Sequence, residues 1–124
     1  MTTGGQDLTG VGRGTWAEDL ALRHLCARGL ALEARNYRCH RGEIDLVMRD
    51  GEVLVFVEVR YRTADRYGGA AETVDHRKRG RIAATAAHYL QYHPRRGGCP
   101  CRFDVVSVNG EAPAIDWIAD AFQP

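Results

Sequence analysis

The chain has 124 residues, of which 44% are hydrophobic and 27% charged, so one globular domain is expected and disorder along the whole chain is excluded. The longest apolar run, Val53–Val57, is far shorter than the roughly 20 residues of a membrane span, and the first residues lack a secretory signal. We therefore expect a cytoplasmic protein with no membrane partner, and the net charge of +1 excludes a strongly basic coat protein for nucleic acid.

The first half of the chain predicts a helix followed by three strands. Residues 1–13 are rich in Gly and Thr and are interpreted as a flexible segment that precedes a domain of residues 14–124. Thr15 and Glu18 have the spacing of a capping box, which predicts a helix from Thr15 to just before Gly29. Strands are predicted at residues 30–37, 43–48 and 52–60, with a hairpin loop at Asp50-Gly51.

The second half of the chain predicts one more helix and one more strand. A loop over residues 61–74 leads to a helix over 75–92, a strand over 102–108 and a short closing element over 115–122. This order predicts an α/β single domain in which helices flank a mixed central β-sheet. The closing element contains Trp117, and it is interpreted either as part of the core or as the surface of a homodimer.

The predicted hairpin places acidic side chains on one face. With the loop centred on Asp50-Gly51, Glu43 lies opposite Glu58, and Asp45 is a diagonal neighbour of Glu58 at roughly 7 Å between Cβ atoms. Such a pair of carboxylates, one of them in a buried strand, is costly unless something offsets the charge.

Two kinds of partner can offset this charge. A divalent cation such as Mg²⁺ binds one or two carboxylates and retains several water molecules. Ion pairs of Arg41 and Arg60 with Glu58 and Glu43 would give a charged but inert face instead. The hairpin alone favours neither interpretation.

Helical spacing allows two further polar side chains to face the sheet. Glu18 could supply a third carboxylate, because it begins a helix face with Ala21, Leu22 and Leu25. Lys78 could supply an ammonium group, because it begins a face with Ile82, Ala86 and Tyr89. The alternatives are that Glu18 belongs to the capping box and that Lys78 is solvated.

Basic residues are concentrated between residues 60 and 81. Because Arg is well suited to binding phosphate, this region predicts contacts with nucleic acid, to which the Gly-rich loop at 68–70 contributes. The expected contact residues are Arg62, Arg66, Arg77, Lys78 and Arg81.

The cysteines and histidines predict no site. Cys39, His40, Cys99 and Cys101 are conceivable zinc ligands, but the CxC spacing is poor for chelation, and reduced thiols are expected. None of the five histidines has the spacing of a ligand set.

Four segments, GEIDLVMRDG (42–51), LVFVEVRYR (54–62), YGGA (67–70) and RFDVV (102–106), resemble the YraN family of uncharacterised bacterial proteins. The resemblance implies a restriction-endonuclease-like fold, similar to Holliday-junction resolvases and other PD-(D/E)xK nucleases. It also implies that Asp45 and Glu58 are metal ligands for Mg²⁺ or Mn²⁺, and that Glu18 is the assisting acid of the first helix.

The chain departs from the nuclease pattern at Arg60, where the pattern has Lys. Arginine cannot be deprotonated in proteins, so Arg60 would stabilise charge without activating water. Three outcomes remain open: a metal-activated water attacks while Arg60 binds phosphate, Lys78 supplies the missing amine, or catalysis is weak or lost. We expect a Mg²⁺-dependent endonuclease acting on branched or structured DNA, with a non-catalytic nucleic-acid-binding module as the alternative.

Overall fold

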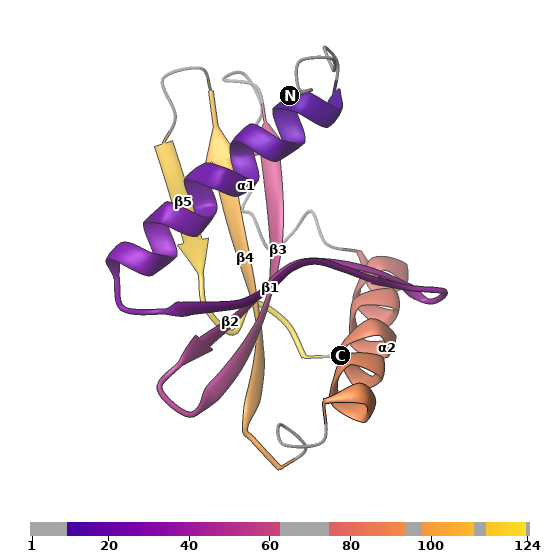
Figure 1. Cartoon of the computed structure of the whole chain (residues 1–124). Coiled ribbons are helices and arrows are strands. Elements are labelled where there is room, and N and C mark those ends of the chain that lie inside the picture. The colour runs from indigo at the N-terminus through magenta and orange to yellow at the C-terminus, as the bar shows by residue number, and fades with distance from the viewer. Residues whose placement is uncertain (1–9, 63–74, 94–97, 111–113, 124) are drawn as a thin grey trace, which may run out of the picture.

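A computed structural model describes residues 10–62, 75–93, 98–110 and 114–123. In these residues the elements are α1 (Gly10–Ala27), β1 (Ala31–Cys39), β2 (Gly42–Asp50), β3 (Val53–Arg62), α2 (His76–Tyr92), β4 (Cys101–Asn109) and β5 (Ala114–Ile118) (Figure 1). The strands form one sheet in the order β1-β2-β3-β4-β5, in which β3 and β4 are parallel and the other neighbours antiparallel. The predicted α/β class with a mixed sheet is confirmed.

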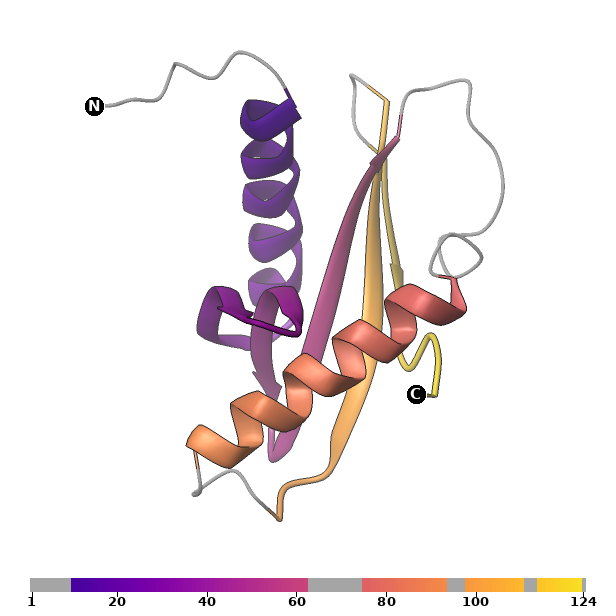
Figure 2. The ribbon, with the colours of Figure 1, turned by 90° about the vertical axis from the view of Figure 1, so that its right-hand side faces the viewer.

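The two helices cover different faces of the sheet (Figure 2). From α1, Ala21 and Leu25 are buried against a cluster that includes Leu46. From α2, Ile82 packs in a second cluster that includes Phe56. Neither helix is long and apolar enough to cross a membrane, over the part of the chain that the structure describes.

Helix α1 begins earlier than the capping box predicts. It starts at Gly10, so Thr15 lies inside the helix, and four residues of the predicted N-terminal segment are helical. The carboxylate of Glu18 accepts hydrogen bonds from β1 and is not used as a cap, so the capping-box prediction is wrong. The predicted end is confirmed, since Gly29 follows the helix with a φ of 98°.

The β2–β3 hairpin differs from the predicted register by two residues. Asp50 pairs with Val53, so the loop consists of Gly51 and Glu52, and Gly51 has the positive φ of 62° that such a loop requires. A shift of two residues leaves the paired residues of β2, from Leu46 to Asp50, on their predicted faces. The pair that would follow Leu46–Val57 is Asp45 with Glu58, but the described pairing ends at Leu46.

Strand β2 separates from β3 at Asp45. The described β2–β3 pairing ends at Leu46, whereas β2 continues to pair with β1 as far as Gly42. Ile44 packs in the cluster on the α2 side, unlike Leu46, so the predicted alternation is wrong at Ile44. The separation of the two strands opens a space beside Asp45.

Helix α2 approaches this opening closely. A Cβ at Gly42 would lie 3.1 Å from Oγ1 of Thr85, which is fully buried, so glycine permits the close contact between β2 and α2. Asp75 caps α2 by accepting a hydrogen bond of 2.8 Å from the main-chain N–H of Lys78. The cap begins α2 three residues before Lys78, and the close contact at Gly42 holds the helix against β2.

The C-terminal residues pack onto the core. Phe122 is buried and its ring stacks on that of Phe103 at 5.2 Å between centroids. The indole N–H of Trp117 donates to Asp104 at 2.9 Å. These contacts support the interpretation of residues 115–122 as a closing element of the core, and the homodimer stays a prediction.

Candidate metal and nucleic-acid site

Carboxylates from several elements gather where β2 leaves β3. Glu58 is buried on β3, and Asp45 is partly buried on β2. A cavity of about 330 Å³ opens beside them, lined by Glu43, Asp45, Glu58, Val59, Lys78, Arg81 and Ile82. The predicted convergence of Asp45 and Glu58 from two adjoining strands is therefore present in the fold.

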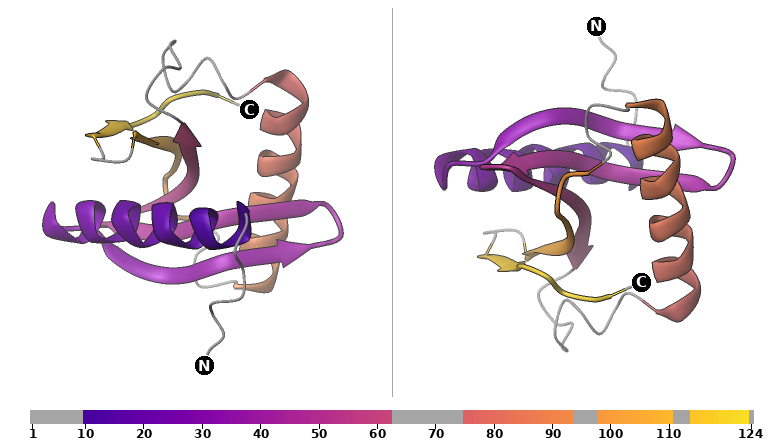
Figure 3. Two further views of the ribbon diagram at one scale, coloured as in Figure 1. Left: turned by 90° about the horizontal axis from the view of Figure 1, so that it is seen from above. Right: turned by 90° about the horizontal axis from the view of Figure 1, so that it is seen from below.

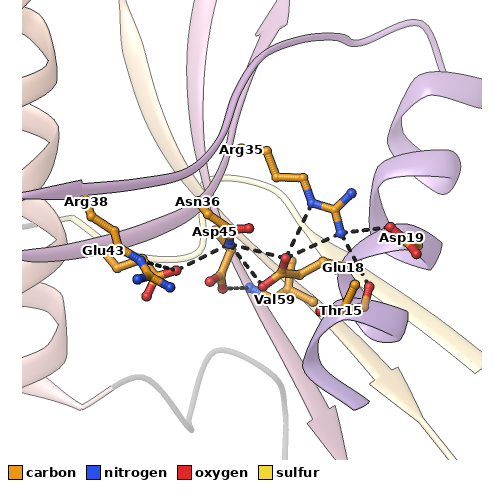
Figure 4. Close-up of polar contacts among 9 residues, drawn as sticks. All are labelled: Thr15, Glu18, Asp19, Arg35, Asn36, Arg38, Glu43, Asp45 and Val59. Atoms are coloured by element: carbon orange, nitrogen blue, oxygen red, sulfur yellow. Dashed lines mark hydrogen bonds and ion pairs between the residues drawn. The ribbon is translucent and has the colours of Figure 1, made fainter. Parts of the chain in front are cut away.

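Asp45 has few groups that stabilise its negative charge. Burial, followed by the negative charge of Glu58, raises the pKa of Asp45 to about 8. The charges of Glu18 and Glu43 raise this pKa further, while a hydrogen bond of 2.8 Å from the N–H of Val59 opposes the rise (Figure 4). A nearby cation would therefore strongly stabilise the ionised form of Asp45.

Glu58 already contacts two basic side chains. Lys78 Nζ lies 2.6 Å from Glu58 Oε2, and Arg60 Nη1 lies 4.0 Å from the same oxygen. Of the two interpretations of Lys78, the structure agrees with the one in which its ammonium group faces the acids of the sheet, and the side chain is partly exposed. The alternative from the sequence paired Arg41 with Glu58 and Arg60 with Glu43, whereas the ion pairs that the structure shows are Arg60 with Glu58, on the same strand, and Arg38 with Glu43, at 3.5 Å.

Glu18 reaches the site from α1 through Asn36. Asn36 Nδ2 donates to both carboxylate oxygens of Glu18, at 3.2 and 3.3 Å, and to Glu43 Oε2 at 3.3 Å (Figure 4). Arg35 also contacts Glu18, at 3.4 Å, and forms an ion pair of 2.7 Å with Asp19. The prediction that Glu18 faces the sheet near the other acids agrees with this arrangement, in which Glu18 is held by polar side chains of β1.

The sequence reasoning missed Asn36. Its φ of 54° lies in the left-handed region within a β-strand, a conformation that asparagine tolerates better than most residues. The one available signal was an Asn inside an otherwise strand-like segment, which by itself does not locate a bend. Asn36 connects the acids of α1 and β2 and so belongs to the site.

The predicted nucleic-acid contacts are only partly within the described residues. Arg81 lines the cavity, Arg77 is exposed on the first turn of α2, and Arg62 is partly exposed at the end of β3. Arg66 and the Gly-rich loop at 68–70 lie outside the described residues. Of the predicted contact residues that the structure describes, Lys78 and Arg81 of α2 line the acidic cavity.

The donor set fits a hard divalent cation. Mg²⁺ prefers carboxylate and water oxygens, and Asp45 and Glu58 supply carboxylates to one cavity. A cation would also relieve the repulsion that raises the pKa of Asp45. Lys78 competes for Glu58, so binding of a cation requires the ammonium to move or to share that carboxylate.

The five-stranded mixed sheet covered by two helices is the architecture of a restriction-endonuclease-like fold. The chain belongs to the uncharacterised protein family UPF0102, whose model matches residues 17–108. It is 51% identical over 109 residues to a UPF0102 protein of Shewanella amazonensis, covering 88% of this chain and 97% of the relative. It is 51% identical over 116 residues to one of Nitrosococcus oceani, covering 90% and 91%. The predicted family resemblance is confirmed.

Proposed function

We propose that this protein is a Mg²⁺-dependent endonuclease that binds branched or structured DNA and hydrolyses a phosphodiester bond. The observation that carries the proposal is the acidic cavity at the point where β2 leaves β3. There, Asp45 and Glu58 share a space with the ammonium group of Lys78. Mn²⁺ is the expected substitute cation, because it also prefers oxygen ligands.

Asp45 and Glu58 are the proposed ligands of the cation. When bound, the cation would supply an acidified water and a positive charge next to the phosphate. Glu18 acts through Asn36, which it shares with Glu43, and so sets the position of the acids around Asp45. Glu18 is accordingly a positioning residue in this proposal unless it reaches the cation through water.

Lys78 is the proposed source of the amine that Arg60 cannot supply. Its Nζ lies 2.6 Å from the carboxylate of Glu58, inside the cavity. In the protonated state Lys78 donates hydrogen bonds to a phosphate oxygen and stabilises the negative charge that develops there. Arg60 and Arg81 flank the same cavity and supply further contacts to phosphate.

The proposal is tested by cleavage of branched and linear DNA with Mg²⁺ or Mn²⁺. The wild type is compared with Asp45→Asn, and with Glu52→Gln as a control, because Glu52 is exposed in the hairpin loop. We expect Asp45→Asn to lower the cleavage rate at least about 100-fold and Glu52→Gln to leave it unchanged. Equal cleavage by the wild type and Asp45→Asn would remove Asp45 from the mechanism.

A non-catalytic nucleic-acid-binding module is the second candidate function. The contacts of Lys78 and Arg60 with Glu58 favour it, because they neutralise this carboxylate without a metal ion. This function predicts salt-dependent DNA binding that persists in EDTA and in Glu58→Ala. Fluorescence anisotropy with labelled branched DNA measures it, and a strict requirement for a divalent ion would exclude it.

A further inference from the structure

A second group of side chains of the metal-ligating types lies at the tip of the β1–β2 hairpin, and its members are not among the residues that line the acidic cavity. Cys39 ends β1, His40 lies in the turn, and His88 faces them from α2. One ligand atom from each of these residues lies within 4.8 Å of the other two. Figure 3 shows the tip of the hairpin beside α2, which is how residues distant in sequence come together.

Tyr37 fixes the orientation of His88. Tyr37 Oη and His88 Nδ1 are 2.6 Å apart, and the ring of Tyr37 packs edge-to-face on Tyr89 at 5.0 Å between centroids. The geometry allows His88 Nδ1–H to donate to Tyr37 Oη, and this is the tautomer that leaves the lone pair of Nε2 available for a metal. A hydrogen bond to the second ring nitrogen is typical of metal-binding histidines, whose tautomer and orientation it sets.

Cys39 and His40 are accessible from solvent. Cys39 is partly buried and its Sγ accepts a hydrogen bond of 3.4 Å from the main-chain N–H of Arg41, while His40 is exposed. Ligand atoms around a tetrahedral Zn²⁺ are roughly 3.5 Å apart, as the usual Zn–N and Zn–S bond lengths require. The ligand atoms therefore need to approach one another by up to about 1 Å to close around an ion, and the exposed side chain of His40 can contribute to this movement.

We propose that Cys39, His40 and His88 bind one Zn²⁺. A thiolate and two imidazoles are ligands for zinc and not for Mg²⁺, so this site is chemically distinct from the acidic cavity. Three protein ligands leave a fourth position for a water molecule. Zn²⁺ would join the hairpin tip to α2, and these are the elements that carry Asp45 and Lys78.

The test is a titration of the full chain with Zn²⁺ by calorimetry and with Co²⁺ by visible absorption. We expect one ion per chain, with affinity lowered at least 100-fold in His40→Ala and His88→Ala, and loss of the thiolate-to-cobalt absorption band in Cys39→Ser. Tyr37→Phe should lower the affinity about tenfold, because it removes the partner of His88. His40 is exposed in a turn, so His40→Ala decides the outcome even if another variant fails to fold.

Two control variants remove the same side-chain types elsewhere in the chain. Cys101→Ser and His76→Ala alter exposed residues outside the group and should bind Zn²⁺ within twofold of the wild type. Zn²⁺ should also raise the Tm of the wild type and leave that of His40→Ala unchanged. Unaltered affinity in His40→Ala, or loss of binding in Cys101→Ser, would overturn the proposal.

Discussion

Two aspartates of this domain, Asp104 and Asp45, have little exposure to solvent, but the surroundings of their carboxylates are opposite in character. Asp104 is fully buried, and its carboxylate accepts hydrogen bonds from three directions. Arg102 Nε donates at 3.0 Å, the indole N–H of Trp117 at 2.9 Å, and the main-chain N–H of Asp120 at 2.9 Å. These donors stabilise the charge, so Asp104 joins β4 to the C-terminal residues and has a structural role.

Asp45 lies in a different environment. Among the described residues, the N–H of Val59 is the one donor to its carboxylate, and its charged neighbours include Glu58. The resulting rise of its pKa to about 8 means that the folded protein favours the neutral form of Asp45 over the ionised form. The difference teaches that a buried acid rich in donors supports the fold, whereas one poor in donors beside a cavity points to a ligand.

The largest expected effect on stability comes from removing Asp104, the aspartate whose carboxylate has several hydrogen-bond donors. Asp104→Ala removes a fully buried carboxylate and leaves the N–H groups of Trp117 and Asp120 without their acceptor, so it should lower the free energy of unfolding by about 3–5 kcal/mol. Urea unfolding followed by circular dichroism measures this change. A loss below about 1 kcal/mol would show that the donors around Asp104 do not hold the fold.

Removing the charge of Asp45 should stabilise the folded protein, in contrast to the loss of stability expected for Asp104→Ala. Because the folded pKa of about 8 exceeds the ordinary 3.8, stability falls as the pH rises between these values. At pH 8.5 without metal, Asp45→Asn should raise the Tm by roughly 8 °C, corresponding to ~2 kcal/mol, and near pH 4 the two proteins should melt alike. Calorimetric scans at both pH values measure the difference, and a variant less stable than the wild type at pH 8.5 would contradict it.

The affinity for Mg²⁺ should depend on the same titration. A cation binds the ionised carboxylate, so the affinity should rise about tenfold between pH 6 and pH 7 and level off above the pKa of about 8. Isothermal titration at several pH values follows this change, with Asp45→Asn as the control that lacks it. A constant affinity for Mg²⁺ from pH 6 to pH 9 would show that cation binding does not depend on the ionisation of Asp45.

The smallest expected effect concerns a single donor to Asp104. Trp117→Phe retains most of the aromatic packing and removes the indole N–H, so it should cost about 1 kcal/mol. Equilibrium unfolding of the variant beside Asp104→Ala tests whether the donors contribute separately. A Trp117→Phe loss as large as that of Asp104→Ala would mean that packing, and not the hydrogen bond, holds this region.

The sequence predicted which acids converge better than it predicted the register. The two-residue error in the β2–β3 loop left the paired residues on their predicted faces, because side chains alternate with a period of two, and Asp45 and Glu58 line one cavity. Helical periodicity allowed Lys78 either to face the sheet or to be solvated, and the structure places it against Glu58. Repeat geometry thus tolerated the error in the loop, but the alternation failed at Ile44, where β2 leaves β3.

Features that depend on tertiary contacts were not predictable. The positive φ of Asn36 arises where β1 and β2 bend away from β3, and no local pattern indicates it. The capping box at Thr15 failed because a helix start depends on the residues before it, and α1 already begins at Gly10. His88 meets Cys39 only through the packing of α2 on the hairpin.

Titration of Mg²⁺ into the wild type, Asp45→Asn and Glu58→Gln at pH 8.5 tests most directly whether the two strands share one cation. We predict one ion per wild-type chain and an affinity at least about 30-fold weaker in each variant, because both carboxylates are ligands. Equal Mg²⁺ affinity in all three proteins would contradict a shared cation between β2 and β3.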